Sequence, residues 1–335
     1  MTPAVHKRIL IIQTASIGDV ILITPLIESL HGQYPEATIH VLVRKGFGAL
    51  FDGHPFVNEV LLWDKKSHKY RNLFRLISKI RHRRYDLVFN VQRFFTTGLL
   101  TALSGAGATV GFDKNPMSRF FSRWVSHHFN AGGSAHHEVD RNLSLIRDFV
   151  SESRRRPRLY PQPSDEDAVM PYKHREYITI APASLWFTKQ YPEERWVSFL
   201  KKAPPHLQVY LLGGPTDQAL CRRIMGAAQH PLTMELCGRL SLLQSAALMR
   251  DARMNFVNDS APLHLCSAVN APVTAVFCST VPEFGFGPLS DDADVVQIDR
   301  PLYCRPCGIH GHRQCPEKHF RCAFEIDENK LLERL

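Results

Sequence analysis

The feature that most constrains the fold of this chain is the alternation of short apolar runs with longer amphipathic stretches. In the first half, five runs have the length and the β-branched or aromatic content of strands, at 9–13, 38–43, 59–63, 86–91 and 109–112. Between them, residues 20–33 and 70–83 repeat apolar side chains at helical spacing. Such a succession gives parallel strands covered by helices on both faces, so we expect an α/β, doubly wound domain.

The second half repeats this pattern after a change of composition. Residues 151–173 are rich in Arg and Pro and predict a linker. Strand-like runs then resume at 177–181, 208–212, 254–258 and 273–277, with helical patterns at 193–202 and 242–249. A chain of 335 residues has the length of two domains. We therefore expect domains at 1–170 and 171–335, with ligands bound in a cleft at the carboxyl ends of both sheets.

Composition narrows the class of protein. Apolar residues make up 44% and charged residues 22%, which are globular values. No secretory signal is recognisable and no apolar run approaches the roughly 20 residues of a membrane helix, so we expect a cytoplasmic protein. Residues 1–175 contain 25 Lys and Arg against 15 Asp and Glu, whereas residues 176–335 contain 16 against 17. The basic half either meets an anionic partner or is simply a solvated face.

The loop after the first predicted strand carries one candidate catalytic group. Residues 14–19 read Thr-Ala-Ser-Ile-Gly-Asp and open the first predicted helix. Gly18 permits close approach of the backbone, and the free amides of a helix start favour anions. The loop has neither a P-loop nor a G-x-G-x-x-G pattern, so nothing in it predicts an ATP or nicotinamide site. Asp19, its only carboxylate, is either a helix-capping acid or a group that acts on a ligand.

Two loops of the second half have a common form, in which a strand ends in polar residues before a new helix. Ser184 and Lys189 follow the strand at 177–181, and a hydroxyl and a lysine there suit a diphosphate. In the other loop, Asp259 could accept from a sugar hydroxyl, while the amides of Ser260 and the next residue would point at a phosphate. The alternatives are a surface lysine at a helix entrance and an ordinary helix N-cap.

All eight cysteines lie in the second half, and four of them crowd the tail: Cys304, Cys307, Cys315 and Cys322. Without a signal peptide a disulfide framework is not expected. Thiolates are zinc ligands, so a structural zinc site is one interpretation of the tail, and buried thiols that pin it are the other.

Three segments resemble glycosyltransferase family 9, the ADP-heptose:lipopolysaccharide heptosyltransferases. Residues 9–21, with Ser-Ile-Gly-Asp at 16–19, are similar to the family's opening strand and its S-[LI]-G-D signature. Residues 183–196 look like its donor-phosphate loop, K-x-W-P-x-E-x-[FW], with Tyr191 in place of the usual Trp. Residues 259–264, Asp-Ser-Ala-Pro-Leu-His, look like its D-[ST]-G-x-x-H.

The resemblance implies a GT-B fold, in which two Rossmann-like domains face each other across a cleft and bind acceptor on 1–170 and nucleotide sugar on 171–335. It also implies an inverting transfer of heptose from ADP-heptose to the inner core of lipopolysaccharide, with no required cofactor. By position, Asp19 matches the family's general base. The donor contacts that the resemblance implies are Ser184, Lys189, Leu240, Asp259, Ser260 and His264.

The basic half fits this interpretation. An inner-core acceptor is anionic and lipid-anchored, so positive residues would attract both the acceptor and the cytoplasmic membrane surface. Gly18 and Arg93, which follows the strand at 86–91, are the candidate acceptor contacts, and the arginine cluster at 81–84 adds general attraction. We therefore expect a cytoplasmic enzyme peripherally associated with the inner membrane.

Some residues depart from the family pattern, and other functions stay open. Pro262 has no amide to donate, and Ala261 stands where the pattern has Gly. Tyr191 would keep an aromatic platform. The first alternative is a GT-B enzyme that uses another nucleotide sugar, as a transferase or an epimerase. The second is a nonenzymatic binder of nucleic acid or anionic membrane, although the chain lacks RRM, KH, zinc-finger and helix-turn-helix signatures.

Overall fold

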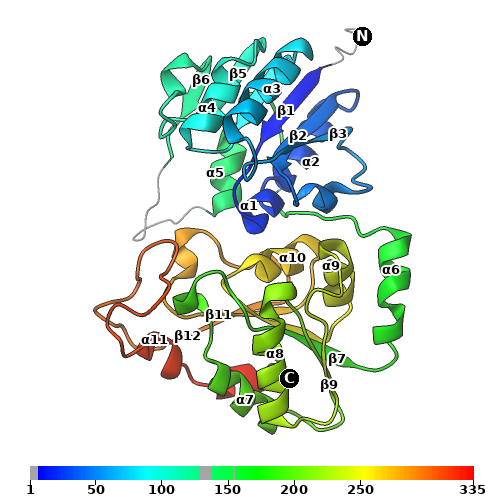
Figure 1. The fold of residues 1–335 in the computed structure, drawn as a ribbon, viewed down its shortest axis with the longest axis vertical. Coiled ribbons are helices and arrows are strands. Elements are labelled where there is room, and N and C mark those ends of the chain that lie inside the picture. The colour runs from blue at the N-terminus through cyan, green and yellow to red at the C-terminus, as the bar shows by residue number, and fades with distance from the viewer. Residues whose placement is uncertain (1–6, 128–136, 154) are drawn as a thin grey trace. The chain divides into compact units, whose positions relative to one another are not determined.

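The computed structural model describes residues 7–127, 137–153 and 155–335, which form two compact units (Figure 1). The first unit runs to Tyr160 and the second begins at Pro161. The division therefore falls earlier in the chain than the predicted one after residue 170.

The first unit is built on a six-stranded, fully parallel sheet in the order β3-β2-β1-β4-β5-β6. Its strands are β1 (Arg8–Ile12), β2 (Thr38–Arg44), β3 (Glu59–Trp63), β4 (Leu87–Asn90), β5 (Ala108–Phe112) and β6 (Arg123–Val125). The central strands β1 and β4 are buried, apart from the first residue of β1. This is why they read as continuous apolar runs rather than as alternating ones.

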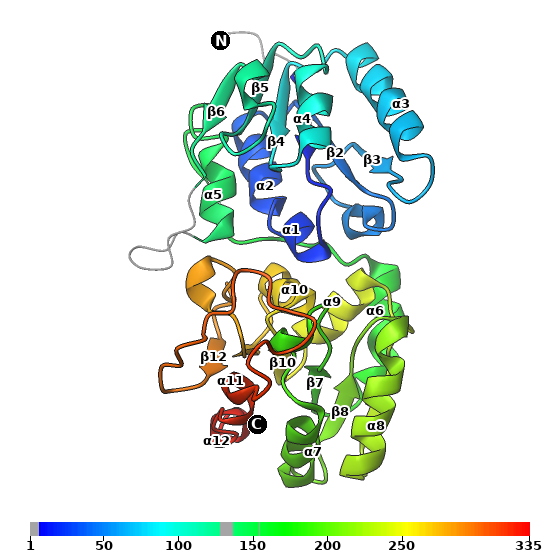
Figure 2. The same cartoon turned by 60° about the vertical axis from the view of Figure 1, so that its left-hand side comes forward.

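Helices cover both faces of this sheet (Figures 1 and 2). They are α1 (Ile17–Ile21), α2 (Thr24–Gln33), α3 (Lys69–His82), α4 (Phe95–Ala102) and α5 (Glu138–Ser144), with short 3-10 turns η1 (Gly48–Phe51) and η2 (Ser118–Phe120). α2 packs beside α5, and α3 packs beside α4.

The single helix predicted for residues 20–33 is two helices in the structure. α1 ends at Ile21, and Pro25 stands at the start of α2. A proline cannot donate its amide to the preceding turn, so a helix that continued through this point would lose a hydrogen bond there. The hydroxyl of Thr24 instead donates to the carbonyl of Ile21 at 2.8 Å.

The second unit repeats the architecture with a sheet in the order β12-β11-β10-β7-β8-β9. Its strands are also parallel, and they are β7 (Tyr177–Ala181), β8 (Gln208–Leu211), β9 (Thr233–Glu235), β10 (Met254–Asn258), β11 (Val273–Phe277) and β12 (Ala293–Gln297). In both units the first and fourth strands lie side by side at the centre. The predicted α/β, doubly wound fold is confirmed in both halves of the chain.

Helices again cover this sheet, with α7 packed against α8 and α9 packed against α10. They are α6 (Pro163–Val169), α7 (Glu193–Lys202), α8 (Gln218–Ala228), α9 (Leu242–Arg250), α10 (Ala261–Val269), α11 (Arg321–Phe324) and α12 (Asn329–Leu332). Short 3-10 turns are η3 (Met170–Tyr172), η4 (Phe187–Lys189), η5 (Pro215–Asp217) and η6 (Pro282–Phe284).

The segment predicted as a linker, residues 151–173, has no helix or strand in its described residues before 163 and is structured after that point. Its second half forms α6 and η3, and α6 packs on α9. Lys173 donates to both Glu166 and Asp251, at 3.1 and 2.6 Å, which ties this segment to the second unit. Pro163 and Pro171 stand in the first turns of α6 and η3, where proline is well suited, whereas Pro157 and Pro161 lie in stretches without a helix or strand. Among the described residues, no helix has both the length and the apolar character needed to cross a bilayer.

Candidate functional site

The predicted site residues lie at the same topological position in each unit. In a doubly wound sheet, the crevice at the carboxyl ends of the strands opens where the strand order reverses. That point lies between β1 and β4 in the first unit and between β7 and β10 in the second. Asp19 and Arg93 come after β1 and β4, while Lys189 and Asp259 come after β7 and β10.

Asp19 belongs to a one-turn capping box in the first unit. Ser16 is the N-cap of α1, and its amide and hydroxyl donate to Asp19 Oδ2 at 3.0 and 2.6 Å. The amide of Asp19 donates back to the Ser16 hydroxyl at 3.3 Å. Asp19 therefore does cap the start of α1, as one of the two interpretations predicted. The same bonds fix the orientation of the carboxylate, which is half-buried, and this is also what a proton acceptor requires.

A buried ion pair interacts electrostatically with this carboxylate. Glu138 and Arg141 form an ion pair at 2.7 Å in α5, with side chains 10% and 7% exposed. Burial raises the pKa of Glu138, and the negative charge of Asp19 raises it further, while Arg141 and Arg93 lower it. Burial and the charges of Arg93 and Arg141 lower the pKa of His127 to about 4. The structure thus brings Arg93 into one charged group with residues that the sequence analysis did not single out.

In the second unit, the two predicted donor loops meet through a buried ion pair. Lys189 Nζ lies 2.6 Å from Asp259 Oδ2, and the two side chains are 15% and 7% exposed. The hydroxyl of Thr280 donates to the same carboxylate oxygen at 2.6 Å. A lysine has three donors. One of them points at Asp259, and the other two are available to an anion such as a diphosphate.

Ser260 directly follows Asp259 as the N-cap of α10, and His264 lies in that helix. Ser260 occupies the N-cap position with an extended backbone, but its side chain does not cap the helix. Its hydroxyl instead donates to the carbonyl of Asn258 at 3.4 Å, which is a long contact. His264 is buried and packs edge-on against Phe286, with ring centroids 6.4 Å apart.

The remaining predicted contacts lie on neighbouring loops of the same unit. Ser184 is half-buried after β7, and its carbonyl accepts from Gln190 Nε2 at 2.6 Å. Leu240 is half-buried and directly precedes Ser241, the N-cap of α9. Gly18 is buried within α1 of the first unit. Their roles toward a ligand stay predictions.

One buried asparagine joins the donor loops and was missed by the sequence analysis. Asn258 Oδ1 accepts from the amide of Tyr191 at 2.9 Å, and Asn258 Nδ2 donates to the carbonyl of Pro182 at 2.7 Å. The side chain is fully buried. The signal in the sequence is an amide side chain at the last residue of an otherwise apolar strand, immediately before Asp259.

Thr188 is a second residue that sequence reasoning missed. Its hydroxyl accepts from the amide of His312 at 2.7 Å and from Ser279 Oγ at 3.0 Å. Its own amide donates to the carbonyl of His312 at 3.1 Å, and its carbonyl accepts from the amide of Ser279 at 3.2 Å. A side-chain carbon at Gly311 would lie 2.9 Å from Thr188 Oγ1 and 3.0 Å from Lys189 Cγ. The cysteine-rich tail is therefore docked directly on the loop that holds Lys189.

Tyr191 does not serve as the aromatic platform that the sequence analysis expected. Its side chain is 1% exposed and packs edge-on against Trp196, with ring centroids 5.1 Å apart. The ring belongs to the core of the second unit. The side chain after Gln190 turns inward because Asn258 holds the backbone of Tyr191.

The four tail cysteines are free thiols. Burial raises the pKa of Cys322 to about 12, and it also raises the pKa of Cys307. In the described part of the chain, no three His, Cys, Asp or Glu side chains are arranged as metal ligands. The structure gives no support to the zinc interpretation, which stays a prediction. Metal analysis of protein purified without a histidine tag tests it, and a stoichiometry near zero would remove it.

The family of the chain follows from comparison with known proteins. The model of glycosyltransferase family 9 (heptosyltransferase) matches residues 73–320, which is more than half of the chain. The chain belongs to glycosyltransferase family 9. It is therefore a glycosyltransferase, and its predicted resemblance to this family is confirmed.

Individual members of family 9 resemble the chain over most of its length. Lipopolysaccharide heptosyltransferase 3 of Escherichia coli is 27% identical over 78% of this chain and 81% of its own. The structure of E. coli ADP-heptose lps heptosyltransferase II is 21% identical, covers 98% of this chain and 97% of its own, and superposes with a TM-score of 0.79. E. coli heptosyltransferase WaaC with ADP is 20% identical, with a TM-score of 0.72 over 97% and 98% of the two chains. The structural likenesses identify the fold as GT-B.

Proposed function

We propose that this family 9 enzyme transfers a heptose from ADP-heptose to the inner core of lipopolysaccharide, with inversion at the anomeric carbon and Asp19 as the general base. The observation that carries the proposal is the buried pair of Lys189 and Asp259 at the strand-order reversal of the second sheet. Two relatives also support the proposal. One is named for lipopolysaccharide heptose transfer, and the structure of another contains ADP.

The second unit would hold the donor. Lys189 would give two hydrogen bonds to the diphosphate while keeping its bond to Asp259. The amides of Ser260 and Ala261 at the start of α10 would add neutral donors, whereas Pro262 has none. Leu240 would pack on the adenine. As the bond from the anomeric carbon to the diphosphate breaks, these donors stabilise the charge that develops on ADP.

The other donor residues would act on the sugar and the phosphates around it. Asp259 would accept from a sugar hydroxyl through the oxygen that does not face Lys189. Ser184, Ser260 and His264 would supply hydroxyl and imidazole groups to the same molecule. Asn258, at the end of β10, would hold the other donor loop beside it, because its side-chain amide bonds to Pro182 and Tyr191 at the two ends of that loop.

The first unit would provide the base. Asp19 would take the proton of the acceptor hydroxyl while the oxygen bonds to the anomeric carbon from the face opposite the leaving ADP. The electron pair of the broken bond leaves with the diphosphate, so charge and protons balance without a further reactant. Gly18 would let the acceptor approach the backbone, and Arg93 would bind an anionic group of the acceptor. We propose that the reaction requires no cofactor.

This proposal places the enzyme at the cytoplasmic face of the inner membrane, because its acceptor is anchored in a lipid bilayer. A screen of nucleotide sugars against defined lipopolysaccharide core acceptors tests it, with the product linkage read by NMR. We expect turnover with ADP-heptose and an inverted anomeric configuration. Preference for a UDP-sugar, or stabilisation against heating by UDP rather than ADP, would refute the proposed donor.

A further inference from the structure

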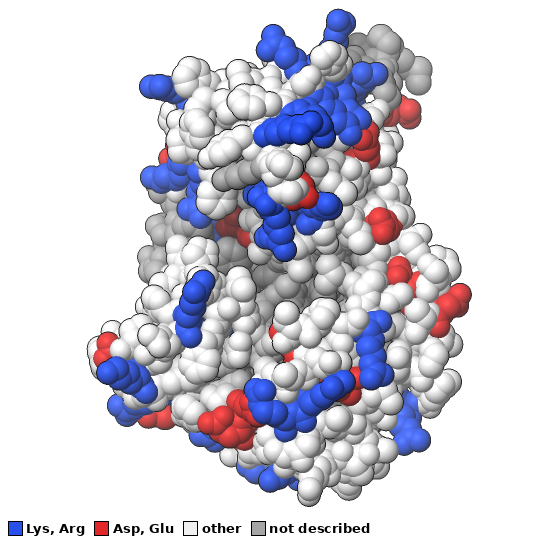
Figure 3. Space-filling view, viewed as in Figure 1, with Lys and Arg blue, Asp and Glu red and all other residues white. Residues whose placement is uncertain are grey.

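Helix α3 is strongly basic and covers the outside of the first unit. Its fourteen residues contain five Lys and Arg and no Asp or Glu. Its inner side is apolar, since Leu73, Leu76 and Ile80 are at most 8% exposed and belong to the core. The helix is thus fixed to its sheet by one side and turns the other outward. Figure 3 shows Lys and Arg side chains gathered over this part of the first unit.

The outward side of α3 carries large aromatic rings as well as cations. Tyr70 is 68% exposed and Phe74 is 64% exposed. They are four residues apart and so lie on one side of the helix, one turn from each other. Arg71 and Arg75 are also exposed and follow each ring in the sequence. We call these four residues the α3 surface.

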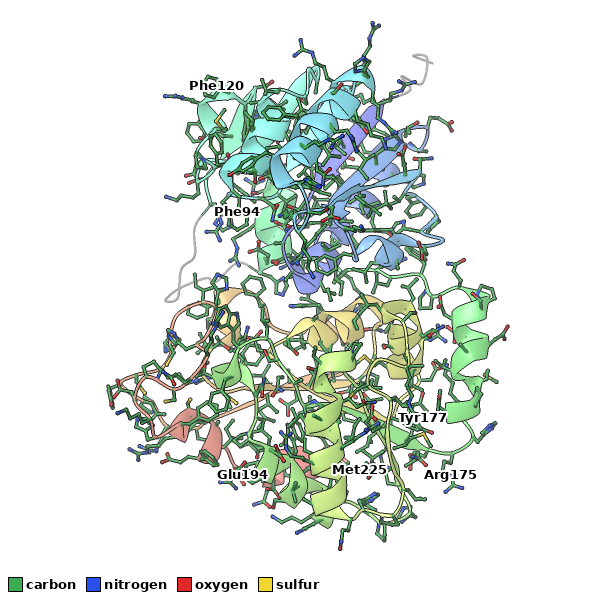
Figure 4. All side chains as sticks on the ribbon, in the orientation of Figure 1. Phe94, Phe120, Arg175, Tyr177, Glu194 and Met225 are labelled. Carbon is green, nitrogen blue, oxygen red and sulfur yellow. The ribbon has the colours of Figure 1, made fainter. Side chains whose placement is uncertain are left out.

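The neighbouring helix extends the apolar character of this region. α4 begins at the same edge of the sheet as α3 and packs beside it. Phe94 and Phe95, at the start of α4, are 59% and 54% exposed. Figure 4 shows Phe94 at the outside of the unit. Four exposed rings at two adjacent helices are more than the scattered apolar residues of an ordinary surface.

We propose that the α3 surface docks the enzyme on a bilayer that contains anionic phospholipids. A basic helix whose polar side is interrupted by aromatic rings suits the interface of a membrane, where rings enter the headgroup layer and cations meet lipid phosphates. Each cation near an anionic leaflet strengthens binding by about fivefold. The proposal rests on the proposed function for its purpose, since docking would bring the first unit to a lipid-linked acceptor.

The occupant is a lipid surface rather than a nucleic acid because of how the rings are presented. Nucleic-acid platforms stack bases on rings that lie within a groove. Tyr70 and Phe74 instead project from the convex outer side of a helix, which meets a flat partner. The core contacts of α3 are made by its inner residues, such as Leu73 and Ile80, so the exposed rings and cations do not serve the packing of the core.

Co-sedimentation with vesicles that lack any glycolipid tests this surface apart from the acceptor site. We expect the full chain to bind vesicles of phosphatidylcholine with phosphatidylglycerol, and to bind pure phosphatidylcholine weakly. The double variant Arg71→Gln, Arg75→Gln should lower the partition coefficient about 25-fold, since two cations are removed. The double variant Tyr70→Ser, Phe74→Ser should lower it about tenfold or more.

The matched control is the double variant Arg175→Gln, Lys201→Gln, which removes two exposed cations from the second unit. Arg175 lies on the outside of that unit (Figure 4). This control should leave vesicle binding unchanged. Circular dichroism verifies that each variant is folded. Every variant should turn over a deacylated, water-soluble core acceptor at the wild-type rate. If the wild-type enzyme itself did not turn over this acceptor, the proposed function would be refuted and not the docking proposal. Three results would overturn the docking proposal. The chain could bind neutral and anionic vesicles equally, or the control variant could lose as much binding as the α3 variants. The third is salt-sensitive binding of RNA without any binding of vesicles.

Discussion

The two units share one strand order but hold their site carboxylates in different ways. Asp19 of the first unit is fixed by Ser16, three residues away in the chain. Asp259 of the second unit is fixed by Lys189 and Thr280, and the loop of Lys189 is held in turn by residues of the C-terminal tail. The difference teaches that Asp19 can be changed at little cost to the fold. The donor loops cannot, because their arrangement is part of the packing of the whole unit.

The largest expected effect is on catalysis at the locally held carboxylate. Asp19→Asn keeps the shape of the side chain and an oxygen for Ser16, but it cannot accept a proton. We expect heptose transfer to fall by about 10²- to 10⁴-fold, the usual contribution of a general base. The affinity for ADP and the midpoint of thermal unfolding should stay near those of the wild type. Transfer at an appreciable fraction of the wild-type rate would remove Asp19 from this role.

The next effect should appear in stability, at the carboxylate held by distant residues. Lys189→Met leaves Asp259 buried without its cation, which should lower the free energy of unfolding by about 3–5 kcal/mol. ADP binding should weaken at the same time. Chemical denaturation and calorimetry measure the two losses. Lys201→Met, at an exposed site of the same unit, is the control and should change neither. Wild-type stability in the Lys189 variant would contradict the contrast between the units.

The first unit should lose stability in acid, because burial strongly lowers the pKa of two of its histidines. Burial lowers the pKa of His54 and of His127 to about 4, from about 6.5. The unfolded chain therefore takes up protons at a higher pH than the folded one. Each histidine contributes up to about 3 kcal/mol of stability that is complete above pH 6.5 and is lost as the pH falls toward 4.

Denaturation of the His54→Gln variant at a series of pH values tests this. The loss of stability between neutral pH and about pH 5 should be smaller in the variant than in the wild type. His174→Gln changes an exposed histidine of the second unit and should keep the wild-type dependence. An unchanged slope in the His54 variant would show that its buried ring does not govern acid sensitivity.

The smallest effect is expected at the junction between the tail and the donor loop. Thr188→Val removes the hydroxyl that accepts from His312 and Ser279, at about 1 kcal/mol for each net hydrogen bond. We expect ADP binding to weaken by about fivefold, through displacement of the adjacent Lys189, with a smaller change in the turnover number. Thr188→Ser restores the hydroxyl and should restore the affinity. If Ser fails to do so, the junction acts through packing alone.

Much of the fold was predictable because buried parallel strands leave a continuous apolar signal. Residues 59–63, 177–181, 254–258 and 273–277 were predicted as strands with the bounds that the structure has. The strands missed by the sequence analysis are β6, β9 and β12, which lie at edges of the two sheets. An edge strand pairs on one side only and is shorter or more exposed, so its composition resembles that of a loop.

The candidate site was predictable where it depends on motif and chain order, and not where it depends on contacts. Lys189 and Asp259 were both predicted as donor residues, but no local pattern indicated that they pair with each other. Thr188 and Asn258 were missed because their partners come from loops far along the chain. The inward turn of Tyr191 was likewise set by a distant side chain rather than by its neighbours in the sequence.

Hydrogen–deuterium exchange with and without ADP tests the central claim most directly. The account predicts that ADP slows exchange in the loops of the second unit at 182–191 and 258–264, around Lys189 and Asp259. Exchange in the loop of Asp19 should be unchanged by the nucleotide alone. Slower exchange confined to the basic first unit, with the two donor loops unaffected, would contradict it.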